Sequence, residues 1–399
     1  MSLEDAARKI ADRLRTMDYV EIYSHHDADG IVAAAILTIA LKRVGISFLL
    51  RFLPYLKKED ITLPEQSILC DLGASIPDWP ESTMIIDHHV PYANTAFHVN
   101  PSLEGIDGGT ELSAAGCAYM VAKILGDNRD LSSLVLVGIL GDSQKIAGMN
   151  REILEEALMN NLVEPKKDLL LPGRTTGEQL ECATMPFLKN ISGNPKTSSE
   201  IESFCTSIPN SEVAVGKLIS EIATRTDASY HDLMTIYGDN YCLLHEVIQD
   251  AYALTAVIDA CGKAGWTDLG YAVAAGDVAQ VDNAWNVALS FRRKVITAVN
   301  SAEKIAPAVW KVSSADVVSD VADILARSLA KPVIVIGEAE KYLKISAHAP
   351  VGMDVNFEQL MKQTTEKFGG YSSGYKTRAT GEIPLDSETD FIATLEVFS

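Results

Sequence analysis

Histidine and aspartate side chains, the usual ligands of divalent metal ions, gather at four places in the first 142 residues. These places are His25-His26-Asp27-Ala28-Asp29-Gly30, Asp71 after the run SILC, Asp87-His88-His89 after TMII, and Asp142 in VGILGD. Three of them follow short apolar runs that are typical of strands. Because ligands of parallel sheets sit at the carboxyl ends of the strands, we expect these side chains to converge in one crevice.

About four carboxylates in one crevice repel one another unless cations are present. Two divalent ions ~3.5–4 Å apart would remove that repulsion, and such a pair can clamp an in-line phosphoryl displacement. Mixed carboxylate and imidazole ligands suit Mn²⁺, with Mg²⁺ or Zn²⁺ as alternatives. The composition of the four motifs therefore predicts a metal-dependent reaction at phosphorus.

Each motif also has an ordinary structural explanation. An isolated aspartate after a strand, such as Asp71 or Asp142, is often the N-cap of a helix. A histidine pair such as His25-His26 is often a polar part of the surface. The DHH triplet after an apolar strand is already unusual, and the ordered set HxDxDG, strand-end Asp, DHH and GxxGD is the strong signal.

The first half of the chain alternates short apolar segments with helical patterns, which predicts an α/β fold with a doubly wound parallel sheet. We expect strands at 19–23, 47–53, 67–71 and 83–87 and helices at 31–44, 111–125 and 131–140. The metal-binding motifs fall at the ends of these strands.

The rest of the chain is predicted to be mostly helical from about 151 to 300, with a break at 188–199. Pro307 begins a second α/β unit that closes with a strand at 390–398. The predicted parts are a core at 1–165, a helical extension with a connecting helix at 166–305, and a smaller C-terminal α/β domain at 306–399.

The composition is that of a folded globular protein, with 47% hydrophobic and 22% charged residues in 399. The longest apolar run, Ile31 to Leu41, is shorter than the ~20 residues that a membrane span requires, and the N-terminal residues resemble an amphipathic helix rather than a secretory signal. We therefore expect a cytoplasmic protein without membrane contact.

The net charge of −20 excludes nucleic-acid binding through a broad positive surface, but a local basic groove stays possible in principle. Residues 331–380 hold seven basic and five acidic side chains, and residues 281–311 hold five and two. A local basic groove for nucleic acid is therefore expected in the C-terminal half.

The ordered motifs resemble those of the DHH phosphoesterase superfamily, and the HxDxDG form is closer to the RecJ-like exonucleases than to the oligoribonuclease branch. Residues 105–126 and 257–277 resemble the archaeal RecJ-like branch in particular. This resemblance implies a DHH catalytic core, a C-terminal DHH-associated domain that binds substrate, and two-metal phosphodiester hydrolysis in a cleft between them.

The resemblance also implies a role for each motif residue. One ion would be held by His25, Asp27 and Asp71, and the other by Asp29, Asp71, His88 and Asp142. Asp71 would bridge the two ions, and Asp87 would orient the histidines. His89 would face the phosphate, where it could stabilise charge or help to protonate the leaving oxygen. His26 is assigned no role.

The substrate loop of the superfamily reads GGHxxAAG, and its glycines let backbone amides approach a phosphate. The corresponding stretch here is 369–381, in which Tyr375 stands where histidine is expected. Its candidate substrate-binding residues are Gly374, Tyr375, Lys376, Arg378 and Gly381. The structural alternative is a simple Gly/Ser turn between a helix and a strand.

The resulting prediction is a two-metal phosphodiesterase that removes nucleotides from the ends of single-stranded DNA or RNA. One alternative is a hydrolase of short oligonucleotides or cyclic dinucleotides. The other is a replisome scaffold, since a eukaryotic helicase cofactor shares this fold without nuclease activity and RecJ-like proteins can bind the GINS complex.

Overall fold

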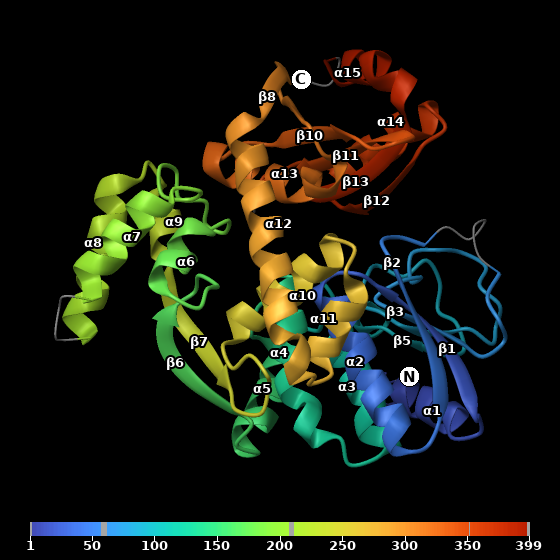
Figure 1. Ribbon diagram of the computed structural model, residues 1–399. Coiled ribbons are helices and arrows are strands. Elements are labelled where there is room, and N and C mark those ends of the chain that lie inside the picture. The colour runs from blue at the N-terminus through green and yellow to red at the C-terminus, as the bar shows by residue number, and fades with distance from the viewer. Residues whose placement is uncertain (1, 57–61, 207–210, 351, 397–399) are drawn as a thin grey trace. The chain divides into compact units, whose positions relative to one another are not determined.

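The computed structural model describes residues 2–56, 62–206, 211–350 and 352–396. A five-stranded parallel sheet organises the N-terminal part of the chain (Figure 1). The strands are β1 (Tyr19–His25), β2 (Ser47–Leu53), β3 (Ser67–Cys70), β4 (Met84–Ile86) and β5 (His98–Val99). They lie in the order β2-β1-β3-β4-β5, and every neighbouring pair is parallel. The predicted α/β fold with a parallel sheet is confirmed.

Seven helices accompany this sheet among the described residues of the first unit. They are α1 (Leu3–Leu14), α2 (Ala28–Arg43), α3 (Ala114–Leu125), α4 (Ser132–Gly141), α5 (Gly148–Met159), α10 (Ala251–Lys263) and α11 (Thr267–Ala274). The helix α2 begins three residues earlier than the predicted Ile31 because the Asp27 carboxylate caps it, accepting the Gly30 N–H at 3.0 Å. In the same way, the Ser113 hydroxyl caps α3, which therefore begins after the predicted Glu111.

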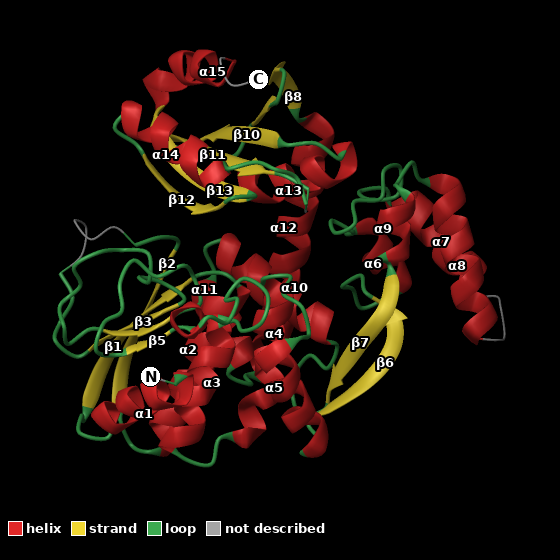
Figure 2. Cartoon of the chain, turned by 180° about the vertical axis from the view of Figure 1, so that it is seen from behind, coloured by secondary structure: helices red, strands yellow, loops and turns green. Residues whose placement is uncertain are grey.

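The segment predicted to be mostly helical also contains two strands. These are β6 (Val163–Leu169) and β7 (Tyr237–Leu243), which pair only with each other and form the long ribbon visible in Figure 2. The sequence did not predict these two strands because they lack the apolar content of a core strand, with only two buried residues in each. Between them lie the helices α6 (Thr176–Glu181), α7 (Pro195–Thr206), α8 (Ser211–Arg225) and α9 (Tyr230–Met234).

A second sheet of six strands forms the C-terminal domain, in the order β12-β13-β11-β10-β9-β8. Its strands are β8 (Glu303–Ala306), β9 (Val309–Val312), β10 (Val333–Glu338), β11 (Tyr342–His348), β12 (Tyr371–Tyr375) and β13 (Arg378–Pro384). The helices are α13 (Val318–Leu329), α14 (Phe357–Lys367) and α15 (Glu388–Glu396). Only β9 and β10 run parallel among these pairs, so the expected smaller α/β domain is present as a mixed sheet.

The predicted final strand at 390–398 is wrong, because its described residues belong to the helix α15. Phe391 and Leu395 are buried in the C-terminal core, and their spacing of four residues places both on one face of a helix. Residues 397 and 398 of that prediction lie outside the described residues.

The chain divides into two compact units. One contains Met1–Leu170 and Gly238–Ala288, and the other contains Leu171–Tyr237 and Leu289–Ser399. The helix α12 (Val281–Ser301), which matches the predicted connecting helix, begins in the first unit and ends in the second. The finer division at 165 and 305 stays a prediction. None of the helices in the described ranges combines the length and apolar content needed to cross a bilayer.

We expect the change Phe391→Ala to lower the free energy of unfolding by about 3–5 kcal/mol, because it would leave a cavity where a fully buried ring packs. Urea unfolding followed by circular dichroism measures the effect. The exposed Thr389 on the same helix provides the control, and Thr389→Ala should change the stability by less than about 0.5 kcal/mol. Equal effects of the two changes would contradict the helical assignment.

Candidate metal centre

The four motifs meet at the carboxyl ends of β1, β3 and β4 and at the C-terminus of α4. The structure forms three overlapping groups whose possible ligand atoms lie within 4.8 Å of one another. They are His25, Asp27 and Asp71; Asp71, Asp87, His88 and His89; and Asp29, His88 and Asp142. All eight residues predicted to bind metal or act beside it are therefore brought together, and His26 belongs to none of these groups.

Asp71 connects two of the groups. Its side chain is 2% exposed, with Oδ2 3.3 Å from Nδ1 of His25 and Oδ1 3.3 Å from Nε2 of His88. The backbone at Asp71 is left-handed (φ 55°), and its N–H donates to the carbonyl of Ile86 at 2.8 Å. This uncommon conformation turns the carboxylate away from the strand direction and toward both histidines.

His88 presents Nε2 to the carboxylates because its other ring nitrogen is already bound. Nδ1 lies 2.6 Å from the carbonyl oxygen of Gly108, which can only accept, so Nδ1 carries the proton. Nε2 is therefore the ring nitrogen available to an ion, and it faces Asp71 at 3.3 Å and Asp142 at 3.2 Å. This is the arrangement by which a backbone carbonyl orients a metal-ligating histidine.

Asp87 is held by the backbone and holds the neighbouring histidines. Its Oδ2 accepts the Ala74 N–H at 2.9 Å, and its Oδ1 accepts the backbone N–H of His88 at 2.7 Å and Nδ1 of His89 at 2.8 Å. Burial acts to raise the pKa of Asp87, but the His89 imidazole and the other donors outweigh it and lower the pKa. Asp87 therefore stays ionised, which agrees with the orienting role expected for it.

Asp29 contributes to the fold as well as to the cluster. Its carboxylate is fully buried and accepts the backbone N–H groups of Ala114 and Ala115 at 2.7 and 2.9 Å, at the N-terminus of α3. The helix α4 can approach so closely only because residue 138 is glycine, since a Cβ there would collide with the Asp29 carboxylate.

Without a bound cation this site retains protons. Burial and the neighbouring Asp71 carboxylate raise the pKa of Asp29 to about 7. Burial and the charge of Asp29 also raise the pKa of Asp142 well above its usual range. Burial opposes charge on His25 and His88, but the facing carboxylates outweigh it and raise the pKa of both imidazoles. Protons thus supply the positive charge that cations would provide.

The donor set fits divalent ions. Three buried atoms, Oδ1 of Asp71, Oδ2 of Asp142 and Nδ1 of His25, make no hydrogen bond of acceptable geometry with the described part of the chain. Buried polar atoms normally have a partner, and a bound ion would provide one here. Carboxylate oxygens together with imidazole nitrogens suit Mn²⁺, and the oxygens alone suit Mg²⁺.

Two amides behind the centre were not recognised from the sequence. The side-chain N–H of Gln144 donates to the Gly108 carbonyl at 2.9 Å, and Asn150 donates to the Gln144 oxygen at 2.8 Å. Both therefore fix the carbonyl that orients His88. Gln144 stands two residues after Asp142, so proximity to a ligand was the only available signal.

The five candidate substrate-binding residues of the C-terminal domain lie in one β-hairpin rather than in an irregular loop. Tyr375 on β12 pairs with Arg378 on β13, and Lys376 and Thr377 form the turn between them. Gly374 is needed where it stands, because its φ is 146° and a Cβ would collide with the Arg378 carbonyl. Lys376 is exposed at the tip, and Gly381 is buried in β13.

Arg378 is already engaged in an ion pair. Its guanidinium donates to Asp323 Oδ1 at 2.8 Å, and Nδ1 of the buried His348 lies 3.5 Å from the same oxygen. Burial acts to raise the pKa of Asp323, but His348 and the two arginines Arg378 and Arg327 lower it. The Arg378 side chain is 44% exposed and therefore still reaches solvent, but its charge is shared with Asp323.

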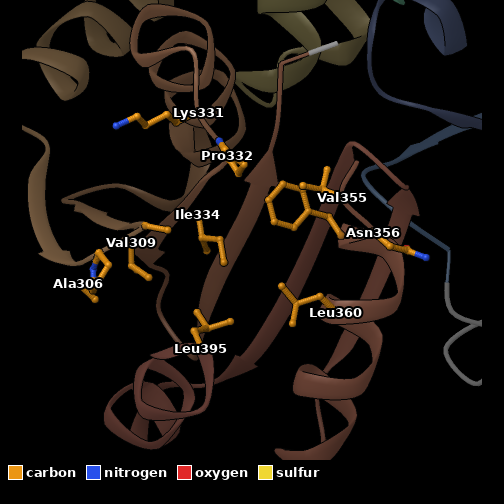
Figure 3. A pocket seen from close by; sticks show the side chains of 12 residues that line it. Ala306, Val309, Lys331, Pro332, Ile334, Val355, Asn356, Leu360 and Leu395 are labelled. Carbon is orange, nitrogen blue, oxygen red and sulfur yellow. The ribbon is translucent and has the colours of Figure 1, made fainter. Parts of the chain in front are cut away.

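A separate cavity of about 450 Å³ lies inside the C-terminal domain (Figure 3). Its twelve lining residues are mainly apolar, such as Ile334, Phe357 and Leu395, with Lys331 and Asn356 as the polar side chains. Carboxylates and imidazoles are missing from this lining, so the cavity does not compete with the strand-end cluster as a metal site.

Comparison with known proteins gives the same fold. Residues 19–139 match the DHH family, N-terminal domain. An uncharacterised protein of Methanocaldococcus jannaschii is 24% identical over 431 aligned positions, which cover 99% of this chain and 96% of that protein.

Among solved structures, RecJ of Thermus thermophilus in complex with Mn²⁺ matches with a TM-score of 0.61 and 15% identity over 99% of this chain and 54% of that one. This chain thus spans about half the length of that RecJ. A manganese-bound exonuclease RecJ matches with a TM-score of 0.59 and 16% identity, covering 100% and 94%. CDC45 from Entamoeba histolytica matches with 0.65 and 14%, covering 97% of each chain.

The parallel sheet and the carboxylate–imidazole cluster at its strand ends define an α/β protein with a candidate divalent-metal centre. Residues 19–139 are thus similar to the DHH family, N-terminal domain, in agreement with the motifs, and the chain has a RecJ-like fold.

We expect the affinity for Mn²⁺ to rise with pH through about 7, because Asp29 must lose a proton held with a pKa of about 7 before it can bind the ion. Below this pH the affinity should fall by about tenfold per pH unit for each proton that the ion displaces. Calorimetric titration from pH 5.5 to 8, in two buffers of different ionisation enthalpy, counts these protons. A constant affinity without proton release would contradict the prediction.

Proposed function

We propose that this protein is a two-metal-dependent phosphodiesterase that acts as a RecJ-like exonuclease on single-stranded DNA or RNA. The observation that supports this most strongly is the sharing of ligands between the three groups, with Asp71 and His88 each belonging to two of them. In our assignment, one ion is bound by His25, Asp27 and Asp71, and the other by Asp29, Asp71, His88 and Asp142.

Bound divalent ions would supply the Lewis acidity and charge neutralisation that an in-line displacement at phosphorus requires. The protein contributes the placement of the surrounding groups. His89 is the outward group, since its side chain is 36% exposed and its Nδ1 is held by Asp87. The remaining ring nitrogen, Nε2, would hydrogen-bond to the phosphate and could deliver a proton to the leaving oxygen.

Manganese is the ion we favour, with magnesium as the alternative. The proposed ligands combine five carboxylate contributions with two imidazoles, and imidazole is a better ligand for Mn²⁺ than for Mg²⁺. The Thermus RecJ has been solved with each of these two ions, which is consistent with a fold that accommodates both.

The substrate in this proposal is also contacted by the hairpin of the C-terminal domain, through Gly374, Tyr375, Lys376, Arg378 and Gly381. Lys376 would be the principal cation, because it is exposed at the tip while Arg378 is shared with Asp323. Tyr375 is uncharged at neutral pH, so its contribution would be stacking or a neutral hydrogen bond.

Two other functions agree with some of the same observations on the fold and the candidate metal centre. The fold match with CDC45 is compatible with a scaffold in a replication assembly, with GINS as a possible type of partner. A scaffold has no need for the orphaned ligand atoms and the oriented histidine, which is why we prefer an enzyme. A hydrolase of short oligonucleotides or cyclic dinucleotides would use the same centre and differ only in the substrate length.

We expect Asp71→Asn to reduce Mn²⁺-dependent hydrolysis of end-labelled single-stranded DNA by at least about 100-fold, because one ligand would be lost from both ions. Asp18→Asn provides the control, since Asp18 is exposed and precedes β1 at the opposite end of the sheet. DNA and RNA of several lengths, with and without a chelator, also separate the exonuclease from the short-substrate hydrolase.

Full turnover by the Asp71→Asn protein would refute the shared-ligand centre. If the parent protein hydrolyses none of these substrates with Mn²⁺ or Mg²⁺, the scaffold function gains support. Circular dichroism of both variants verifies that the fold is retained.

Binding of single-stranded DNA should weaken with salt, and Lys376→Ala should reduce the slope of log K against log [salt] by about 0.7, the value for one lost phosphate contact on a single strand. The measurement is a fluorescence-anisotropy titration of a labelled oligonucleotide at several salt concentrations. Lys341→Ala, which removes another exposed lysine of the same domain, is the charge-matched control. An equal effect of both changes would show that only net charge matters.

A further inference from the structure

The end of α10 lies directly against the metal-binding loop. A Cβ at position 262 would collide with the backbone carbonyl of His26, so only glycine allows this approach. His26 stands between His25 and Asp27, two of the proposed ligands. The residues that follow Gly262 therefore leave α10 at the edge of the candidate metal centre.

These residues form a tight, well-bonded turn into α11. The N–H of Gly265 donates to the Gly262 carbonyl at 3.0 Å, and the N–H of Trp266 donates to the Cys261 carbonyl at 2.8 Å. Gly262 and Gly270 both lie close to the side chain of Ile31, in the first turn of α2, so α10 and α11 pack against the helix that begins at this loop. Figures 1 and 2 both show α10 and α11 beside α2.

This turn presents a large exposed aromatic ring. Trp266 is 60% exposed, whereas Trp79 and Trp285 are 8% and 5% exposed, and Trp310 is half-buried. Single exposed apolar residues are common on proteins, so exposure alone has little meaning. Here the exposed tryptophan stands four residues after Gly262, whose backbone lies against the carbonyl of His26 in the candidate metal-binding loop.

We propose that Trp266 is a stacking platform for a nucleobase of the strand whose phosphodiester enters the metal centre. This inference rests on the proposed phosphodiesterase function and specifies its substrate as a nucleotide chain with unpaired bases. Every base offers a π-face, so an indole contributes affinity without selecting a sequence. Stacking also needs no positive charge, which suits a protein with a net charge of −20.

The test uses two decamers with the same phosphates, oligo-dT and an abasic strand, in the absence of divalent ions. The parent protein should bind oligo-dT about 5- to 150-fold more tightly than the abasic strand, which is the range for one stacked base. Trp266→Ala should lose most of this preference for oligo-dT. Trp266→Phe retains a ring and should keep most of the preference, but it should lose the quenching of tryptophan fluorescence that oligo-dT causes in the parent.

Tyr19→Ala is the control, because Tyr19 is an aromatic residue, 40% exposed, at the start of β1, the end of that strand opposite to the ligands. It should leave the preference for oligo-dT unchanged. The inference is overturned if Trp266→Ala keeps the parent's preference, or if it weakens binding of both decamers by the same factor. A failure of the proposed function would instead appear as absent metal-dependent hydrolysis by the parent, which this binding test does not measure.

Discussion

The repulsion between buried carboxylates at the carboxyl ends of three strands is the constraint on which the rest of this structure depends. Asp29, Asp71 and Asp87 are each 2% exposed or less, and Asp142 lies beside them. Their charges cannot all be maintained without compensation in so small a volume. Protonation of Asp29 and of the imidazoles provides it in the metal-free protein, and divalent ions can replace these protons. The same unfavourable electrostatics that would destabilise the fold therefore creates the affinity for cations.

The backbone makes this arrangement possible. Amide N–H groups of Ala74 and Ala114 neutralise part of the charge on Asp87 and Asp29, and a carbonyl fixes the tautomer of His88. Elements can pack this densely only where side chains are absent, as at Gly138 and Gly262. A methyl group at either position would displace a helix from the cluster, so these glycines position the site although neither can bind a ligand.

The sequence was sufficient to predict four of the five strands and the convergence of the four motifs, because β1, β3 and β4 are short apolar runs that end at polar residues, whereas the two-residue strand β5 was not predicted. Such a local signal was missing for β6 and β7, which pair only with each other, and for the pairing of Arg378 with Asp323, which is distant in the sequence. The sequence of α15 predicts a strand because a short run of apolar residues fits the periodicity of a strand as well as that of a helix. The burial of Phe391 and Leu395 distinguishes the two. Local periodicity thus predicts the elements that carry the ligands, whereas partners of charged side chains depend on the tertiary structure.

The basic residues expected to attract nucleic acid are largely occupied within the protein. Arg293 pairs with Glu181 and Lys294 with Asp316, while Lys311 contacts Glu338 and Glu388. The excess of basic side chains in residues 281–311 is therefore used in internal ion pairs rather than presented as a basic groove. An acidic protein of this kind can hold a phosphodiester only where charge is supplied locally, by ions in the strand-end cluster and by an exposed lysine such as Lys376. In the proposed function, contacts to the bases would then provide the affinity that a continuous basic surface provides in nucleic-acid-binding proteins.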